Sequence, residues 1–316
     1  MNNPGRAETA FFIGDVAVDD YFTAERWPGV ADKAAFSESN SYVGGMIANA
    51  ASVHAGLGGS TEFISLLNHG ALSQRLCDDM GAHNVGTAHM LYDPNVPDSR
   101  NMIFLVGGEH VVLYVETGDM PMVLTTPAFA ALQTPGYLYT TLSRAKRLRF
   151  GLLSGAEVLA ELRGFGRRTV FDLDVEGFEP GDEAYLAGAD VVIMNEIGFG
   201  LSFGAADLAA VNEWMAANGV KTVIRTLAAA GAEMYDGAGV TLVPGHRVPV
   251  VDVTGAGDTF GGALVYALSA KSGMAEALAF AVAAASRAVT NEGPRGGVAT
   301  PAEVEEFRQE QSLSAR

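Results

Sequence analysis

The chain has 316 residues, of which 48% are hydrophobic and 18% are charged, a balance that excludes an intrinsically disordered protein. Its formal net charge of −17 disfavours nucleic acid as a partner, because proteins bind nucleic acid through basic surfaces. The single cysteine excludes an intramolecular disulfide. Residues 1–20 lack the pattern of a signal peptide, and the alanine-rich segment 274–290 lacks that of a membrane span. We therefore expect a cytoplasmic protein without a membrane partner.

Short apolar runs alternate with longer helical patterns along the chain. Strands are predicted over residues 11–18, 62–67, 137–141, 169–173, 191–194 and 221–226. Helices are predicted between them over residues 47–57, 73–80, 155–162 and 206–218. This alternation predicts an α/β fold with a mostly parallel sheet and helices on both of its faces.

Two segments break this alternation. Residues 101–106 and 110–115 flank Gly107-Gly108, which is the pattern of a β-hairpin, and residues 21–43 lack helical periodicity. We expect a small β lid, from about residues 20–43 and 98–116, within a single domain that comprises residues 1–316. The alternative is a surface hairpin without a role. Exposed strand edges pair readily, so a homodimer through the lid is a further expectation.

The most informative segment is residues 250–262, VVDVTGAGDTFGG. Gly255, Ala256 and Gly257 lead into a helix predicted from about Asp258 towards Ala270. Backbone amides at a helix start have no partner in the helix and, with the helix dipole, suit a phosphate group. Phosphoryl transfer needs such donors beside a carboxylate that orients and deprotonates the attacking hydroxyl. The segment therefore indicates a phosphotransferase, with Asp258 as the candidate base.

Two other interpretations of this segment are open. Asp258 could be an ordinary helix N-cap after a glycine turn. Gly255, Gly257 and Gly261 also form GxGxxxG, a weak match to a dinucleotide fingerprint. That fingerprint needs a second strand ending in an acidic residue about 20 residues further on, and Glu276 lies near that distance in a helical pattern instead.

Asp252 to Gly261 resembles the C-terminal signature of the ribokinase-like (PfkB) carbohydrate kinases, D-x-x-G-A-G-D-x-F-x-x-G. Gly44-Gly45, Asn49-Ala50 and Leu57-Gly58 are similar to a second, N-terminal signature of that family, and residues 14–19 are similar to its first strand. The resemblance covers nearly the whole chain. It implies a ribokinase-like three-layer α/β/α sandwich with a mostly parallel central sheet and a small β lid.

The resemblance implies ATP-dependent phosphorylation of a hydroxyl on a sugar or a sugar-derived, even acidic, small molecule. Asp258 would be the general base, and the amides of residues 255–257 would form the anion hole. The acceptor would be held by Asp19, Gly44, Gly45 and Asn49. Asp20 competes with Asp19 for this role, and Asn49 could instead be a satisfied polar group inside a helix.

On the nucleotide side, Asn195 follows a strand, as in the family's N-x-x-E motif. Thr226 and Gly231 lie where the family has T-x-G-x-x-G, so these residues and Gly257 would contact ATP. The resemblance also implies a requirement for Mg²⁺, and it leaves open a monovalent cation near Asp252.

The sequence departs from the family at three nucleotide-side positions. Gly198 replaces the expected glutamate, with Glu196 the nearby carboxylate, and Ala228 replaces the middle glycine of the second motif. Val282 lies where some members have asparagine. We therefore expect Mg²⁺ to be held mainly by ATP and water, with its protein ligands unassigned.

Arg144 is a candidate for acceptor binding. It follows the predicted strand 137–141, and ligands of open α/β sheets lie beyond the carboxyl ends of strands. It begins a basic cluster with Lys146, Arg147 and Arg149, and arginine would suit a carboxylate, phosphate or sulfonate on the acceptor. The alternative is a solvated basic helix start.

Two other functions are compatible with the sequence. A nucleoside kinase of the same fold is expected if the acceptor pocket is aromatic and apolar. A catalytically silent ligand sensor is suggested by the changed nucleotide motifs, although the presence of Asp258 disfavours it.

Overall fold

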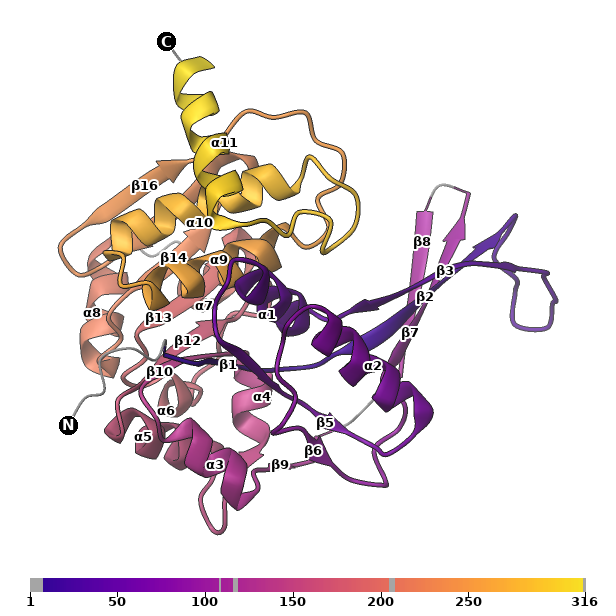
Figure 1. Cartoon of the computed structure of the whole chain (residues 1–316), viewed down its shortest axis with the longest axis horizontal. Coiled ribbons are helices and arrows are strands. Elements are labelled where there is room, and N and C mark those ends of the chain that lie inside the picture. The colour runs from indigo at the N-terminus through magenta and orange to yellow at the C-terminus, as the bar shows by residue number, and fades with distance from the viewer. Residues whose placement is uncertain (1–7, 108, 116–118, 205–207, 315–316) are drawn as a thin grey trace.

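The computed structural model describes residues 8–107, 109–115, 119–204 and 208–314. An eight-stranded sheet lies between two layers of helices, and a four-stranded sheet projects to one side (Figure 1). This arrangement confirms the predicted three-layer α/β/α sandwich. No helix in the described part of the chain combines the length and hydropathy needed to cross a membrane.

The large sheet has the strand order β16-β15-β14-β13-β12-β10-β1-β4. Its strands are β1 (Ala10–Ile13), β4 (Thr61–Ile64), β10 (Gly136–Thr140), β12 (Arg167–Asp172), β13 (Val191–Asn195), β14 (Val223–Thr226), β15 (Gly231–Tyr235) and β16 (Val240–Pro244). All pairs from β4 to β14 are parallel, and β15 and β16 add an antiparallel edge. Every residue of β1 and β10 is buried, as expected where helices cover both faces of a parallel sheet.

The helices form two layers. One layer consists of α1 (Met46–Gly56), α2 (Ala71–Ala82), α9 (Ala256–Ser269), α10 (Met274–Ala288) and α11 (Pro301–Ser314). The other consists of α3 (Thr126–Leu132), α4 (Leu142–Arg147), α5 (Gly155–Gly164), α6 (Glu183–Leu186), α7 (Glu196–Phe203) and α8 (Leu208–Asn218). Successive strand residues face opposite layers, so Phe12 packs with the first and Phe11 with the second.

Close packing of α1 against α9 brings together two of the predicted site residues. Nine residues of each helix are buried, most of them small. A side chain added at Gly262 would collide with the backbone carbonyl of Ala50, so the two helices approach as closely as glycine permits. This approach brings Asn49 and Asp258, which are separated by 209 residues, into hydrogen-bond contact.

The predicted strand over residues 11–18 is wrong as a single element. β1 ends at Ile13, and the chain re-enters extended structure as β2 (Ala17–Ala24) in the small sheet. The predicted strand 62–67 is likewise divided into β4 and β5 (Leu66–Leu67), which pairs with β6 (Leu91–Tyr92). Residues 206 and 207 of the predicted helix 206–218 lie outside the described residues.

The small sheet has the order β3-β2-β7-β8 and includes β3 (Ser37–Gly44), β7 (Arg100–Val106) and β8 (Glu109–Tyr114). The predicted hairpin is present as the antiparallel pair β7–β8, although Gly108 and residue 116 lie outside the described residues. Parallel pairing of β2 with β7 joins the two predicted lid segments into one sheet. A further short pair, β9 (Met122–Val123) with β11 (Leu148–Arg149), lies elsewhere in the chain. A role as a lid stays a prediction.

Candidate active site

The start of α9 has an unusual backbone. Its N-cap residue is Gly255, with φ 76°, in the left-handed region that glycine adopts without strain. Ala256 N–H already donates to Val253 O at 3.2 Å, whereas Gly257 N–H has no hydrogen-bond partner in the described part of the chain. Gly255 N–H likewise has no partner among the described residues, so two of the three predicted anion-hole amides are available.

Asp258 is the third helical residue, so its interpretation as an N-cap is wrong. Its Oδ2 instead accepts a hydrogen bond from Asn49 Nδ2 at 2.8 Å. Burial raises the pKa of Asp258 to about 7, with help from the neighbouring Asp172 and Asp174, while Asn49 and Arg295 oppose the shift. A carboxylate whose pKa lies near neutral pH is well suited to accept a proton from a hydroxyl.

The dinucleotide interpretation of the same glycines is also wrong. α9 is followed by α10 and α11, and the described residues after β16 contain no further strand. Glu276 lies in the first turn of α10. The second strand that a dinucleotide-binding unit requires is therefore missing.

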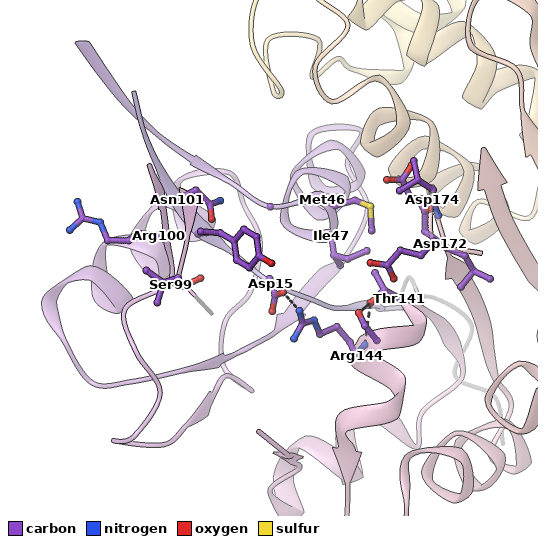
Figure 2. Close-up of a pocket in the computed structure, with 18 residues that line it drawn as sticks. Asp15, Met46, Ile47, Ser99, Arg100, Asn101, Thr141, Arg144, Asp172 and Asp174 are labelled. Carbon is purple, nitrogen blue, oxygen red and sulfur yellow. Dashed lines mark hydrogen bonds and ion pairs between the residues drawn. The ribbon is translucent and has the colours of Figure 1, made fainter. Parts of the chain in front are cut away.

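A polar cavity of about 410 Å³ lies between the small sheet and the carboxyl ends of the central strands (Figure 2). We call it the polar cavity. Its lining includes Asp15, Gly45, Asn101, Arg144, Asp172 and Asp174. Gly45 and Arg144 are the predicted acceptor residues that line it directly. Figure 2 shows Asn101 on the side of the small sheet, and Asp172 and Asp174 on the opposite side.

Asp19 and Asp20 lie on opposite faces of β2, because successive side chains of a strand point in opposite directions. Asp20 is buried, accepts a hydrogen bond from Ser41 Oγ at 2.7 Å and forms an ion pair with Arg100. Asp19 faces the other side of β2, where its Oδ1 accepts from Asn101 Nδ2 at 2.7 Å. A side chain at Gly44 would collide with the Asp19 carboxylate, so these two predicted residues are neighbours.

Arg144 points into the polar cavity, where it forms an ion pair with Asp15 (Figure 2). Its side chain is only 16% exposed, so it is not part of a solvated helix start. The other residues of the predicted basic cluster line a separate cavity of about 620 Å³ together with Arg144, and two of them have partners of their own. Lys146 pairs with Asp182 at 2.6 Å, and Arg147 Nε donates to Met120 O at 2.7 Å.

Sequence reasoning missed Asp172 and its partner. Asp172 ends β12, and its Oδ2 accepts a hydrogen bond from the Tyr139 hydroxyl at 2.5 Å. Burial raises the pKa of Asp172 to about 6. Its position at the carboxyl end of a central strand was the available signal, since that edge of an α/β sheet collects ligand-binding residues.

A second cavity of about 550 Å³, which we call the apolar cavity, adjoins the start of α9. Three of the predicted nucleotide residues line it: Thr226, Gly231 and Gly257. Val282 on α10 and Ala228 line it as well. Ala228 has φ 48°, the left-handed conformation that the glycine of the family motif would adopt without strain.

Asn195 does not line the apolar cavity within the described residues. It is the N-cap of α7, and its Oδ1 accepts from the backbone N–H groups of Ile197 and Gly198, both at 3.0 Å. Its Nδ2 donates to Asp174 Oδ1 at 3.0 Å. Asn195 therefore orients a carboxylate of the polar cavity, which differs from the predicted contact with ATP.

The described residues contain no cluster of three or more histidine, cysteine or acidic side chains arranged to hold a metal ion. Asp172 and Asp174 nevertheless offer carboxylate oxygens, the ligand type that Mg²⁺ prefers. They fit a magnesium ion that takes its other ligands from phosphate and water. Both oxygens of Asp252 accept backbone hydrogen bonds, from Thr254 N at 2.9 Å and Gly293 N at 2.9 Å, and a monovalent cation beside it stays a prediction.

Arg295 is a further residue that sequence reasoning missed. It lies in the loop after α10, and its Nε donates to Asn49 Oδ1 at 2.9 Å. It also forms an ion pair with Asp79 on α2, and its side chain is only 10% exposed. The surrounding sequence, Gly-Pro-Arg-Gly-Gly, resembles a glycine-rich turn that some family members place beside the ATP site, but it does not predict the contact of Arg295 with Asn49.

Residues 8–301 match the family model described as pfkB family carbohydrate kinase. The chain is 25% identical over 283 residues to the ribokinase of Haemophilus influenzae, which covers 84% of this chain and 86% of the relative. It is 26% identical over 315 residues to the aminoimidazole riboside kinase of Salmonella typhimurium, covering 88% and 92%.

Among solved structures, the ribokinase of Arabidopsis thaliana complexed with ribose and ATP has a TM-score of 0.82 at 21% identity, covering 96% of this chain and 99% of that chain. The fructokinase of Xylella fastidiosa with bound ATP has a TM-score of 0.75 at 23% identity, covering 97% and 100%. These likenesses establish the ribokinase fold. Together with the family match over most of the sequence, they confirm that the chain belongs to the pfkB family of carbohydrate kinases.

Proposed function

We propose that this protein is a kinase that transfers a phosphoryl group from ATP to a hydroxyl of a sugar or sugar derivative, with Asp258 as the general base. The observation that carries this proposal is that groups next to Asp258 line two different cavities, although Asp258 itself is in neither lining. The preceding residues, Ala256 and Gly257, line the apolar cavity. Asp172 and Asp174, which act on the pKa of Asp258, line the polar cavity. Because the donor is ATP, we expect the reaction to occur in the cytoplasm.

In the proposed step, the acceptor hydroxyl transfers its proton to Asp258 while its oxygen forms a bond to the γ-phosphorus of ATP. The bond from that phosphorus to the leaving oxygen breaks, and ADP leaves with the electron pair. Gly257 N–H and the positive end of the α9 dipole would receive the developing charge. A magnesium ion, when bound, would balance the phosphate charge, and Asp172 and Asp174 would hold it.

The polar cavity favours an uncharged acceptor over an acidic one. Its two arginines are each paired with a carboxylate, Arg144 with Asp15 and Arg100 with Asp20. Three more acidic side chains line the same cavity: Asp172, Asp174 and Glu176. Since an anionic acceptor would have to displace Asp15 from Arg144, we propose neutral hydroxylated sugars as the acceptor class. The Arabidopsis relative complexed with ribose and ATP agrees with this choice.

The small sheet is proposed to act as a lid on the acceptor. Arg100, Asn101 and Tyr114 line the polar cavity from β7 and β8. Closure over a bound acceptor would exclude water, which otherwise competes with the acceptor for the phosphoryl group. We propose that the small sheet and the large α/β body form one kinase domain, because residues of both line the polar cavity.

A nucleoside kinase is the second candidate, supported by the similarity to an aminoimidazole riboside kinase. The character of the polar cavity argues against it. Tyr114 is the one aromatic residue in its described lining, whereas a nucleobase is bound best by aromatic and apolar side chains. A silent sensor is disfavoured because the base, the helix start and both cavities are present together.

An acceptor screen tests the proposed function. The purified protein is incubated with ATP and Mg²⁺ and with neutral sugars, sugar acids, sugar phosphates or nucleosides, and phosphorylated products and ADP are measured by mass spectrometry. We expect a neutral sugar to be phosphorylated with one ADP formed per product. Failure of every acceptor would overturn the proposed function. Preference for an acid or a nucleoside would overturn the acceptor class while leaving the kinase assignment in place.

A further inference from the structure

Arg295 connects three separate parts of the chain. The loop that carries it follows α10, yet its side chain reaches Asn49 on α1 and Asp79 on α2. The contact with Asn49 is a hydrogen bond from Nε to Oδ1 at 2.9 Å, and the contact with Asp79 is an ion pair. Asn49 itself is 4% exposed, so both ends of this hydrogen bond are shielded from water.

The Arg295 contact fixes the orientation of the Asn49 amide. A side-chain amide has an oxygen that only accepts hydrogen bonds and a nitrogen that only donates them. Since Arg295 Nε–H occupies the oxygen, the nitrogen faces Asp258 and donates to Oδ2 at 2.8 Å. If the amide turned over, its oxygen would face the carboxylate oxygen of Asp258, and the two acceptors would repel each other.

We propose that Arg295 is a positioning residue of the phosphotransfer site, which acts through Asn49 to hold the Asp258 carboxylate in place. This proposal rests on the proposed function of Asp258 as the base. Arg295 is assigned no contact with the acceptor or with ATP.

The charge of Arg295 supports the same role. The side chains that act on the pKa of Asp258 are those of Asn49 on α1, Asp172 at the end of β12, Asp174 two residues further on, and Arg295. Tyr139 on β10 is in turn affected by the charge of Asp258. Arg295 is the one cation among them. Its charge opposes the rise in the pKa of Asp258, so it helps to keep the base ionised at neutral pH. It opposes the rise in the pKa of Asp19 in the same way.

The Arg295 loop also supports the start of α9. A side chain at Gly255 would collide with the backbone of Pro294, and Gly293 N–H donates to Asp252 Oδ2 at 2.9 Å. The loop therefore packs against the anion-hole segment through its backbone while Arg295 contacts the base through Asn49. The loop that carries Arg295 therefore holds the anion-hole segment and the Asp258 carboxylate in fixed positions relative to each other.

Substitution of Arg295 tests the proposal. Arg295→Met keeps the length of the side chain but removes its charge and its hydrogen bonds. We expect kcat to fall by about 10- to 100-fold, the loss that corresponds to a hydrogen bond of a charged group, with little change in the KM for ATP. In the dependence of kcat on pH, we also expect the fall in kcat on the acid side to begin at a higher pH, because loss of the Arg295 charge raises the pKa of Asp258. Arg295→Lys, which keeps the charge, should recover much of the pH profile.

Arg287→Met is the matched control. Arg287 also contacts this loop, because it donates to Gly297 O at 3.3 Å, and it pairs with Glu303. It has no role in the hydrogen-bond chain to Asp258. If Arg287→Met and Arg295→Met lose equal activity with unshifted pH profiles, Arg295 merely stabilises the loop and the proposal is wrong. If Arg295→Met does not fold, Arg295→Gln, which removes the charge but keeps a hydrogen-bond donor, takes its place. An acid-side fall in kcat that begins at a higher pH in this variant supports the proposal, and an unmoved fall overturns it.

A titration that needs no turnover separates this proposal from the proposed function. The pKa of the Asp258 carboxyl is measured by carbon NMR, with Asp258→Asn used to assign its resonance. We expect a higher pKa in Arg295→Met than in wild type, and an unchanged pKa would contradict the proposal. If the wild-type protein phosphorylates no acceptor, the proposed function fails, while the titration still decides whether Arg295 acts on Asp258.

Discussion

Asp258 is the side chain on which the proposed chemistry depends most directly. Asp258→Asn keeps the shape of the residue and an oxygen for Asn49 Nδ2, but it cannot accept the proton of the acceptor hydroxyl. We expect kcat to fall by about 10²–10⁴-fold, the usual contribution of a general base, while circular dichroism stays unchanged. Single-turnover transfer measured with the true acceptor checks this. Near wild-type kcat in the variant would show that another group takes the proton.

Arg144 lines the polar cavity, and its guanidinium group is already paired with a carboxylate there. Because Arg144 pairs with Asp15, its loss would leave the Asp15 carboxylate unpaired in the polar cavity. We expect Arg144→Ala to raise the KM for a neutral acceptor about tenfold, equivalent to about 1.4 kcal/mol, and to leave the KM for ATP unchanged. Lys146→Ala is the matched control, since Lys146 is on the same helix but pairs with Asp182. A larger loss for acidic than for neutral acceptors would instead show that Arg144 binds an acceptor anion.

At the scale of elements, α7 explains why the expected glutamate is absent. Gly198 packs so closely that a side chain there would collide with the backbone carbonyl of Asp174. We expect Gly198→Ala to lower the free energy of unfolding by about 1–3 kcal/mol and to raise the Mg²⁺ concentration needed for half-maximal activity, since Asp174 must move. Chemical denaturation and magnesium titration check this. Gly200→Ala on the same helix has open space around it and should be neutral or stabilising.

The small sheet contributes to the polar cavity through its central and outer strands. Deletion of residues 101–115 should raise ATP hydrolysis relative to phosphoryl transfer, because water would reach the γ-phosphate. The same deletion should weaken any dimer, since exposed Val112 and Tyr114 lie on the outer strand β8. Product analysis measures the first effect, and light scattering measures the second. An unchanged ratio of hydrolysis to transfer would contradict the lid, and an unchanged mass would contradict the dimer.

At the scale of the whole molecule, ionisation of Asp258 is expected to raise the activity and to lower the stability of the folded state. Its pKa in the folded state, about 7, exceeds its ordinary value of 3.8, so folding favours the protonated form. The stability that this group contributes is complete below pH 3.8 and is lost as the pH rises through 7. The base works only when ionised, so kcat/KM should rise over the upper part of the same range.

Comparison of the wild-type protein with Asp258→Asn isolates this effect. The free energy of unfolding of the variant, relative to wild type, should increase between pH 4 and pH 8, by up to about 4 kcal/mol from a shift of this size. Denaturation at a series of pH values measures it, and the other titrating groups cancel in the difference. A constant difference across this range would mean that the pKa of Asp258 is not raised.

The sequence by itself determined the fold class and the family, and it predicted where the chemistry takes place. Alternating apolar and amphipathic segments predicted the parallel α/β sheet, because strand and helix periodicities follow from local geometry. The glycine-rich segment before Asp258 predicted a helix start with free amides, since those residues are contiguous in the chain. The same local reasoning failed over residues 11–18, where one apolar run serves two different sheets.

Only the tertiary structure decided which side chains meet. The pairing of Arg144 with Asp15, the different partners of Asp19 and Asp20, and the hydrogen bond from Asn195 to Asp174 all depend on how separate elements pack. Arg295 is the clearest case, since it lies 246 residues from Asn49 and no local pattern relates the two. Hydrogen bonds and ion pairs act over a few ångströms in space, so residues that are distant in sequence acquire their partners only when the helices and loops have packed.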